Sequence, residues 1–176
     1  MQKVEKDYKE LLKLFNKHKV KYCIVGAFAV AFYAVPRYTK DMDILVEPSR
    51  ENGQRIIKAL NEFGFNPSDL YADDFSKDGR IIQLGYEPVR VDILTSIDGC
   101  IFKEIWGNKK KGQYGKEDVY FIGLEELIKN KRALKRKQDG ADIEVLLITK
   151  KRLMGCTKNK ESLSTLGFPN CRKLKN

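Results

Sequence analysis

The sequence predicts an α/β protein of the α+β type, in which a small mixed β-sheet is flanked by helices. Short apolar or alternating runs that are typical of strands are separated by segments with the helical spacing of apolar residues. The chain has 176 residues, which suits one domain with a real core. Its hydrophobic content of 42% and charged content of 33% are typical of a globular protein.

The first third of the chain predicts a helix, a strand and a second helix. Apolar residues recur at helical spacing through residues 4–18, which indicates an amphipathic helix. Residues 22–25 form a short apolar strand, and Gly26 allows a tight turn after it. Residues 28–35 predict a helix that ends before Pro36. Because this helix follows the glycine directly, its free N–H groups form a natural phosphate cradle.

The middle of the chain predicts a capped helix and a hairpin. Pro48-Ser49 opens a helix that runs to about Phe63, and Gly64 ends it. The polar stretch 66–79 is expected to be an irregular loop. Residues 80–84 and 89–94 flank a Gly- and Pro-containing turn and are expected to form the hairpin.

The last part of the chain becomes basic and then loses its apolar periodicity. We expect residues 1–150 to form one domain and residues 151–176 to be a loosely ordered basic tail. Between the hairpin and the tail, the predicted elements are a short helix or loop at 102–106, a basic loop at 109–115, a strand at 119–122, a helix at 124–134 and a last helix around 143–147.

Two aspartates, one residue apart, open a predicted strand at residues 41–46. Residues i and i+2 of a strand point to the same face, so Asp41 and Asp43 should project together. Two carboxylates held side by side repel each other unless a cation lies between them. A divalent metal ion explains the pair most simply, and a surface position on an edge strand is the alternative.

Asp92 is a third carboxylate that can join this pair. It lies in the alternating strand 89–94, on the face opposite Val91 and Ile93. If the two strands are neighbours, three carboxylates come together, and Mg²⁺ prefers such oxygen ligands, with water and substrate phosphates completing the set. Such a set is typical of two-metal phosphoryl or nucleotidyl transfer. An ion pair with Arg90 or a lysine is the alternative role of Asp92.

Val25-Gly26-Ala27, Asp41-Met42-Asp43 and Asp92 resemble the signature of the minimal nucleotidyltransferases of the polymerase-beta-like superfamily. That signature is a hydrophobic residue, a Gly followed by Gly or Ser, a spacer, Asp-x-Asp and a later Asp. Ala27 departs from it, because alanine offers the phosphates only its backbone N–H.

The stretch Arg37-Tyr38-Thr39-Lys40-Asp41-Met42-Asp43 is similar to an Arg-x-Thr-x-Asp-x-Asp variant of the signature. This variant occurs in an uncharacterised bacterial and archaeal subgroup related to abortive-infection toxins and small antibiotic-modifying enzymes. The resemblance covers roughly residues 20–147 and extends through Leu127-Ile128, Lys131, Arg136, Asp139 and Asp142.

The resemblance implies a nucleotidyltransferase fold and the Mg²⁺-dependent transfer of a nucleoside monophosphate from an NTP such as ATP to an acceptor hydroxyl. Asp41, Asp43 and Asp92 would be the catalytic residues and would hold two Mg²⁺ ions, which Mn²⁺ can replace. The nucleotide contacts that it implies are Gly26, Ala27, Arg37, Thr39, Lys131 and Arg136.

Other roles for these residues and for the protein remain open at this stage. Arg37 and Thr39 could instead shape the turn into the strand, and Lys131 and Arg136 could form a solvated basic face. Asp139 and Asp142 are expected to orient those two bases or to cap the last helix. The whole protein could be a catalytically inactive nucleotide- or RNA-binding protein on the same fold. It could also be the toxin of a toxin–antitoxin pair, with tRNA as acceptor and an antitoxin as partner.

The net charge of +10 falls entirely in the second half of the sequence. Residues 1–99 hold 15 Lys/Arg and 15 Asp/Glu, whereas residues 100–176 hold 19 and 9. A basic face beside a metal site suits a polyanion, either an NTP or an RNA acceptor, and a solvated surface is the alternative. The residues expected to attract the polyanion are Lys109, Lys110, Lys111, Lys131, Lys135 and Arg136.

Several classes of protein are excluded. The single histidine, His18, excludes a histidine-based nucleophilic triad, and the four cysteines show no zinc-binding spacing. The first 21 residues lack a signal-peptide core, and the longest apolar stretch is too short to span a bilayer. We therefore expect a cytoplasmic protein that does not bind membranes.

Overall fold

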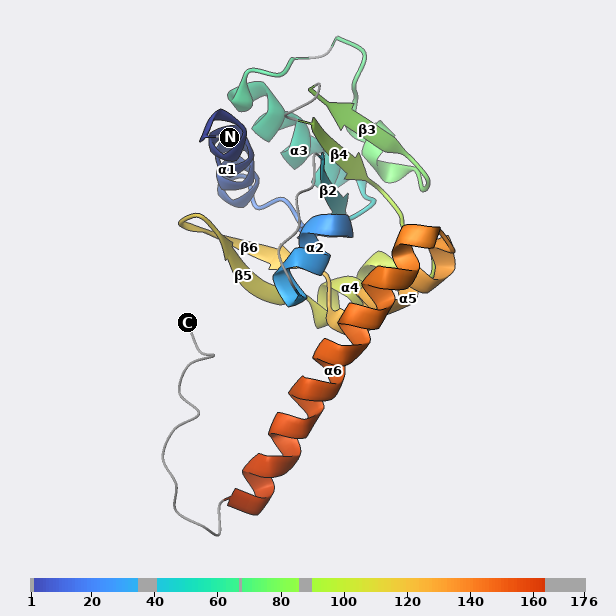
Figure 1. Ribbon diagram of the computed structural model, residues 1–176. Helices are drawn as coiled ribbons and strands as arrows, with labels where there is room; N and C mark the ends of the chain where they lie inside the picture. Colours follow the sequence, from blue (N-terminus) through green and yellow to red (C-terminus); the bar gives the residue numbers. More distant parts are fainter. Residues whose placement is uncertain (1, 35–40, 67, 86–89, 164–176) are drawn as a thin grey trace.

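The computed structural model describes residues 2–34, 41–66, 68–85 and 90–163. Its helices and strands follow the chain as helix, strand and helix, then mostly strands, then helices (Figure 1). The elements are α1 (Gln2–Lys17), β1 (Tyr22–Ile24), α2 (Gly26–Tyr33), β2 (Asp41–Val46), α3 (Arg50–Phe63), the 3-10 helix η1 (Ala72–Ser76), β3 (Ile81–Leu84), β4 (Arg90–Leu94), α4 (Phe102–Asn108), β5 (Lys110–Tyr114), β6 (Glu117–Phe121), α5 (Leu124–Leu134) and α6 (Lys137–Leu163).

The strands form one mixed sheet in the order β3-β4-β2-β1-β6-β5. β2 runs parallel to β4, and β1 runs parallel to β6. The other neighbouring strands are antiparallel, including β3 and β4, which confirms the expected hairpin. The architecture is therefore the predicted α/β arrangement of a small mixed sheet flanked by helices.

The two faces of the sheet have different surroundings. Met42, Ile44 and Val46 of β2 are fully buried in the hydrophobic core. On this face α1 packs against α3, and the Tyr8 hydroxyl of α1 donates a 3.1 Å hydrogen bond to the Arg90 carbonyl. On the other face α2 packs on β2 and contacts α5 and α6. The predicted alternation of β2 is thus confirmed, and its two aspartates point to the side of α2.

Local signals explain where the helices begin and end. The Ser49 side chain accepts a 3.2 Å hydrogen bond from the Asn52 N–H, which caps α3 as predicted. Gly64 ends the helix in the left-handed conformation, with φ of 89°. α2 begins at Gly26, two residues earlier than predicted, because the preceding Val25 already has the extended backbone of an N-cap.

Three predicted loops or tails prove to be more regular than expected. Residues 110–114 of the expected basic loop form edge strand β5, because their backbone pairs with β6 although the side chains show no apolar alternation. The 66–79 stretch contains η1, where the Asp74 carboxylate accepts a 3.0 Å hydrogen bond from the Tyr71 N–H. Of the two alternatives at 102–106, the helix is correct.

Helix α6 crosses the expected domain boundary near residue 150. It runs to Leu163 and projects away from the sheet in Figure 1. The expected tail is therefore helical over residues 151–163, and its remaining residues lie outside the described ranges. In the described part of the chain, no helix combines the length and the apolar character needed to cross a membrane.

Candidate active site

The parallel pairing of β2 and β4 brings four charged residues together. In the strand register, Asp43 lies opposite Asp92 and Asp41 lies opposite Arg90. Because side chains alternate along a strand, all four project from the same face of the sheet. The structure therefore confirms that the strand of Asp92 neighbours the strand of the aspartate pair.

The pKa of the Asp43 carboxyl is raised in this arrangement. Burial raises the pKa of its carboxyl from 3.8 to about 6, and the like charges of Asp92 and Asp41 add to the shift. The cations Lys131 and Arg90 act in the opposite direction without cancelling it. A further cation at this position would relieve the repulsion.

Position 26 requires a glycine, because Asp43 lies too close for any side chain. Its φ is +60°, and a Cβ atom built on it would lie 2.0 Å from the Asp43 Oδ2 atom. The glycine therefore lets the start of α2 approach the carboxylate directly. The first N–H groups of a helix have no intrahelical acceptor, so those of Gly26 and Ala27 suit an anion held beside Asp43.

Arg90 holds the carboxylate of Asp92 at two points. Its Nε donates to Asp92 Oδ1 at 3.0 Å, and its Nη2 donates to Asp92 Oδ2 at 2.7 Å. The same Nη2 lies 3.5 Å from Asp41 Oδ2. The alternative role of Asp92, an ion pair with Arg90, is the one that the structure displays.

The carboxylates fit Mg²⁺ by their chemistry, although their present arrangement is not that of a closed metal site. Among the described residues, no group of three or more histidine, cysteine, aspartate or glutamate side chains is arranged to hold a metal ion. Three adjacent carboxylates still provide the hard oxygen ligands that Mg²⁺ prefers, and their mutual repulsion favours a cation.

A pocket of about 390 Å³ opens beside Asp43. Its lining includes Gly26 and Ala27 at the start of α2, Lys131 of α5 and Arg136 just after α5. This volume is in the range of small-molecule and cofactor sites. The pocket thus brings together five of the predicted site residues, whereas Arg37 and Thr39 lie outside the described ranges.

The pocket also contains residues that the sequence analysis missed. Ser96, Asp98, Asn130 and Gln138 line it. Asn130 is buried and donates a 3.0 Å hydrogen bond to the Asp98 carbonyl, which fixes the loop after β4 against α5. Its position on the apolar side of the predicted helix, between Leu127 and Leu134, was the one available signal, because a buried amide needs a partner.

Lys131 is buried rather than part of a solvated face. Only 5% of the residue is exposed, and its Nζ lies 2.8 Å from Asp139 Oδ1 and 2.9 Å from Asp142 Oδ2. Arg136 is exposed, with its Nε 3.9 Å from Asp139 Oδ2. Asp139 and Asp142 therefore hold Lys131, Asp139 also lies near Arg136, and α5 and α6 are joined by a buried ionic contact at the pocket.

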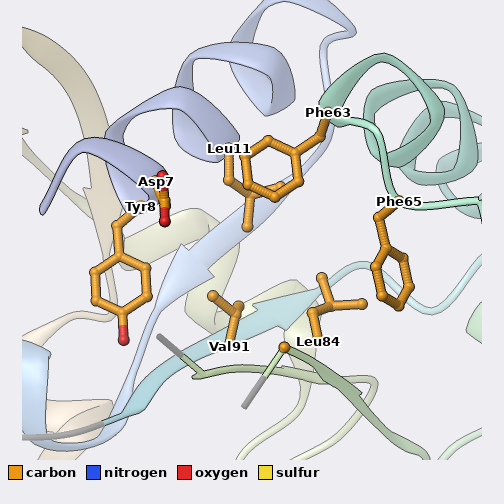
Figure 2. A pocket seen from close by; sticks show the side chains of 8 residues that line it. Asp7, Tyr8, Leu11, Phe63, Phe65, Leu84 and Val91 are labelled. Carbon is orange, nitrogen blue, oxygen red and sulfur yellow. The ribbon is translucent and has the colours of Figure 1, made fainter. Parts of the chain in front are cut away.

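A second cavity lies on the opposite face of the sheet and is separate from the carboxylates. Figure 2 shows Tyr8, Leu11, Phe63, Phe65 and Val91 around it. Its volume is about 370 Å³ and its walls are mainly apolar. Since Val91 and Asp92 point to opposite faces of β4, this cavity has no access to the carboxylate group.

A third cavity, of about 620 Å³, adjoins the carboxylate pocket, because Ser96 and Ile97 line both. The third cavity is lined in part by Phe102 and Trp106, whose rings stack at 5.8 Å between centroids. It provides an aromatic surface next to the carboxylate pocket.

Comparison with known proteins identifies the fold. No family model matches the chain, and no curated protein matches its sequence. Among solved structures, the lincosamide antibiotic adenylyltransferase LnuA with bound lincomycin is 18% identical, with a TM-score of 0.50 over 80% of this chain and 94% of that chain. This likeness shows that the chain has the α/β nucleotidyltransferase fold.

Two further solved structures are similar at slightly lower scores. The antibiotic-resistance factor ANT(2'')-Ia is 11% identical, with a TM-score of 0.49 over 90% of this chain and 96% of that chain. An antigenic nucleotidyltransferase-like protein from Paracoccidioides brasiliensis is 10% identical, with a TM-score of 0.49 over 94% of this chain and 92% of that chain.

Proposed function

We propose that the protein transfers a nucleoside monophosphate from an NTP to an acceptor hydroxyl. The observation that supports this most strongly is the pairing of β2 with β4, which puts Asp43 opposite Asp92 with Asp41 on the same face. Of these carboxylates, Asp43 adjoins the N-terminus of α2 and lines a pocket with a buried lysine. The N-terminus of α2, which suits an anion, thus lies beside a carboxylate, which suits a cation.

Each residue of the site has a distinct part in this proposal. The N–H groups of Gly26 and Ala27 bind triphosphate oxygens, and the exposed Arg136, which lines the same pocket, adds positive charge. Lys131 contacts the nucleotide from the same pocket, with its own charge matched by Asp139 and Asp142. Asp41 and Asp43 would hold two Mg²⁺ ions, one serving the triphosphate and the other, on the acceptor side, also held by Asp92. Mg²⁺ would neutralise phosphate charge and lower the pKa of the acceptor hydroxyl. The acceptor oxygen bonds to the α-phosphorus, its proton is released, and pyrophosphate leaves.

The acceptor can be small or macromolecular. The aromatic cavity at Phe102 and Trp106 has room for a small hydroxyl compound and adjoins the nucleotide pocket. The basic second half of the chain favours RNA. A protein hydroxyl, and tRNA in a toxin that is paired with an antitoxin, are further acceptors that the same chemistry allows.

A catalytically inactive nucleotide-binding protein is the second candidate. The observation that favours it is the two-point contact of Arg90 with Asp92, because it engages both oxygens of a carboxylate that catalysis requires. Ala27 agrees with this interpretation, since it departs from the Gly or Ser of the signature and offers the phosphates only its backbone N–H.

Transfer of radioactive label from NTPs tests the proposal. The protein is incubated with Mg²⁺ and either α-³²P- or γ-³²P-labelled NTPs, together with total RNA, proteins or a panel of small hydroxyl compounds. We expect an acceptor to take label from the α position alone, and Asp43→Asn to abolish this transfer. Binding of NTP without pyrophosphate release for any acceptor would favour the inactive candidate.

A further inference from the structure

We propose that Arg90 is an internal cation that occupies the acceptor-side metal position. In the nucleotide-free protein, it would leave one position open to a divalent ion, at Asp43, and close the other, at Asp92. This inference rests on the proposed function, and it adds an order to the binding of the two ions.

The contacts of Arg90 are those of a bound cation. Both oxygens of Asp92 accept hydrogen bonds from it, and Asp41 Oδ2 lies 3.5 Å from the same Nη2 that contacts Asp92. A planar guanidinium matches a carboxylate at two points, and such charge-assisted pairs are the stronger hydrogen bonds. A metal ion that bound Asp92 would therefore have to displace Arg90 from the same oxygens.

Asp43 differs from Asp92 in its access to ligands. Asp43 lines the 390 Å³ pocket, whereas Asp41, Arg90 and Asp92 are not among the residues that line it. An ion that enters with a nucleotide can thus reach Asp43 directly. The two carboxylates lie opposite each other in the register but are not equivalent.

The Arg90 side chain can leave without unfolding the strand. Its carbonyl is held by the Tyr8 hydroxyl, and its Cα is paired with Asp41 in the sheet. The side chain is 30% exposed, so solvent reaches the guanidinium. Rotation of the side chain alone would free Asp92, with the backbone fixed.

Counting bound Mn²⁺ ions in the nucleotide-free protein tests the proposal. Electron paramagnetic resonance of free Mn²⁺ gives the stoichiometry and the Kd. We expect one ion in the wild type and a second, bound at least tenfold more tightly than any second wild-type ion, in Arg90→Gln. Arg80→Gln is the matched control and should behave as wild type, because Arg80 is an exposed arginine just before β3 whose side chain pairs with Asp74.

Two carboxylate variants test the same proposal in protein that retains Arg90. Because Arg90 already engages Asp92, Asp92→Asn should leave the single Mn²⁺ Kd within about twofold of wild type. Asp43→Asn should abolish binding. This pair keeps the proposal falsifiable if Arg90→Gln does not fold.

The outcomes separate this inference from the proposed function. Equal numbers of ions, with equal Kd values, in wild type and Arg90→Gln would overturn the role of Arg90 and leave the metal site intact. A loss of Mn²⁺ binding in Asp92→Asn as large as that in Asp43→Asn would do the same. Absence of Mn²⁺ binding in every variant would overturn the proposed metal site itself, and the inference with it.

Discussion

At the residue scale, the site depends on the contact between a glycine and a carboxylate. Any side chain at position 26 would have to adopt φ of +60° and would meet Asp43 at 2.0 Å. Gly64 has a similar φ of +89°, but a Cβ atom added to it would have no other atom within 4 Å. Alanine variants of the two glycines therefore separate the cost of a left-handed backbone from the cost of the clash with Asp43.

We predict that Gly26→Ala is the more destabilising of the two changes. Gly64→Ala should lower the free energy of unfolding by about 1–2 kcal/mol, the cost of a left-handed backbone in a residue with a Cβ. Gly26→Ala should cost more than this and should also abolish nucleotide binding, because Asp43 must move. Urea unfolding and calorimetric titration with Mg²⁺ and NTP measure the two effects. Equal losses of stability for both variants would show that the contact with Asp43 is absent.

A pH dependence follows from the environment of Asp43. Its folded pKa of about 6 exceeds the ordinary 3.8, so the folded protein binds more protons than the unfolded chain between these values. The contribution of Asp43 to stability is therefore full below pH 3.8 and is lost as the pH rises through 6.

We predict a fall in the stability of the wild type relative to Asp43→Asn as the pH rises. In the presence of a metal chelator, the free energy of unfolding of the wild type minus that of Asp43→Asn should decrease by up to about 3 kcal/mol from pH 4 to pH 7. Urea unfolding of both proteins across this range provides the comparison. A difference that does not change with pH would contradict the assigned environment of Asp43.

At the scale of elements, a buried ionic contact joins α5 to α6. Lys131 is matched by two carboxylates, which are themselves almost fully buried. Lys129, two residues earlier on α5, is exposed and lies 3.8 Å from Glu104. One helix thus offers a buried and an exposed lysine for comparison.

We predict that Lys131→Met lowers the free energy of unfolding by about 3–5 kcal/mol, because Asp139 and Asp142 would stay buried without their cation. Lys129→Met should change it by less than about 1 kcal/mol, as is usual for an exposed pair. Chemical denaturation measures both. Similar small losses in the two variants would mean that Lys131 is not the residue that holds α5 and α6 together.

The elements that the sequence predicted are those with strong local signals. The caps of α3 at Ser49 and Gly64 and the alternation of β2 were predicted correctly, because each depends on neighbouring residues. β5 was missed, since an edge strand of lysines and glutamine is held by backbone pairing with β6. The length of α6 was missed because residues 151–154 are exposed, so no apolar period marks this part of the helix.

The site was predictable to the extent that it follows from spacing within strands. The common face of Asp41 and Asp43 is a property of one strand, and the alternation of residues 89–94, together with the resemblance to a known signature, supplied Asp92. The contact between Arg90 and Asp41 could not be derived, because it depends on the register between strands that lie far apart in the sequence. The ionic contact of Lys131 likewise depends on how two helices pack.

At the scale of the whole molecule, the basic second half is only partly available to a polyanion. Lys131 is buried, and Lys109 lies over the Trp106 ring at 3.9 Å. Lys110 and Lys111 are exposed on β5, where Lys111 pairs with Asp118 at the surface. These two lysines are therefore the better choice for a test of RNA binding, since replacing them leaves the core unchanged.

We predict that binding to RNA weakens with salt and that Lys110→Ala with Lys111→Ala reduces this dependence. The slope of log K against log salt should fall by roughly 0.7 for each phosphate of single-stranded RNA that the variant no longer neutralises. Lys13→Ala with Lys58→Ala, on exposed positions of α1 and α3, is the control of equal charge and should keep the wild-type slope. Absence of RNA binding at low salt would point instead to a small acceptor.

The central claim is that Asp43 serves the nucleotide while Asp92 serves the attacking hydroxyl. The structure supports this division, because Asp43 lines the 390 Å³ pocket whereas Asp92 does not and is held by Arg90. The two roles predict different losses in two variants that each remove one carboxylate charge.

Binding and transfer measured in parallel for Asp92→Asn and Asp43→Asn test this claim most directly. For Asp92→Asn, we predict an affinity for Mg²⁺ and NTP within about threefold of wild type and a loss of transfer to the acceptor of about 10³-fold or more. For Asp43→Asn, both should be lost. Transfer that survives in Asp92→Asn would contradict the assignment of Asp92, and with it the proposed active site.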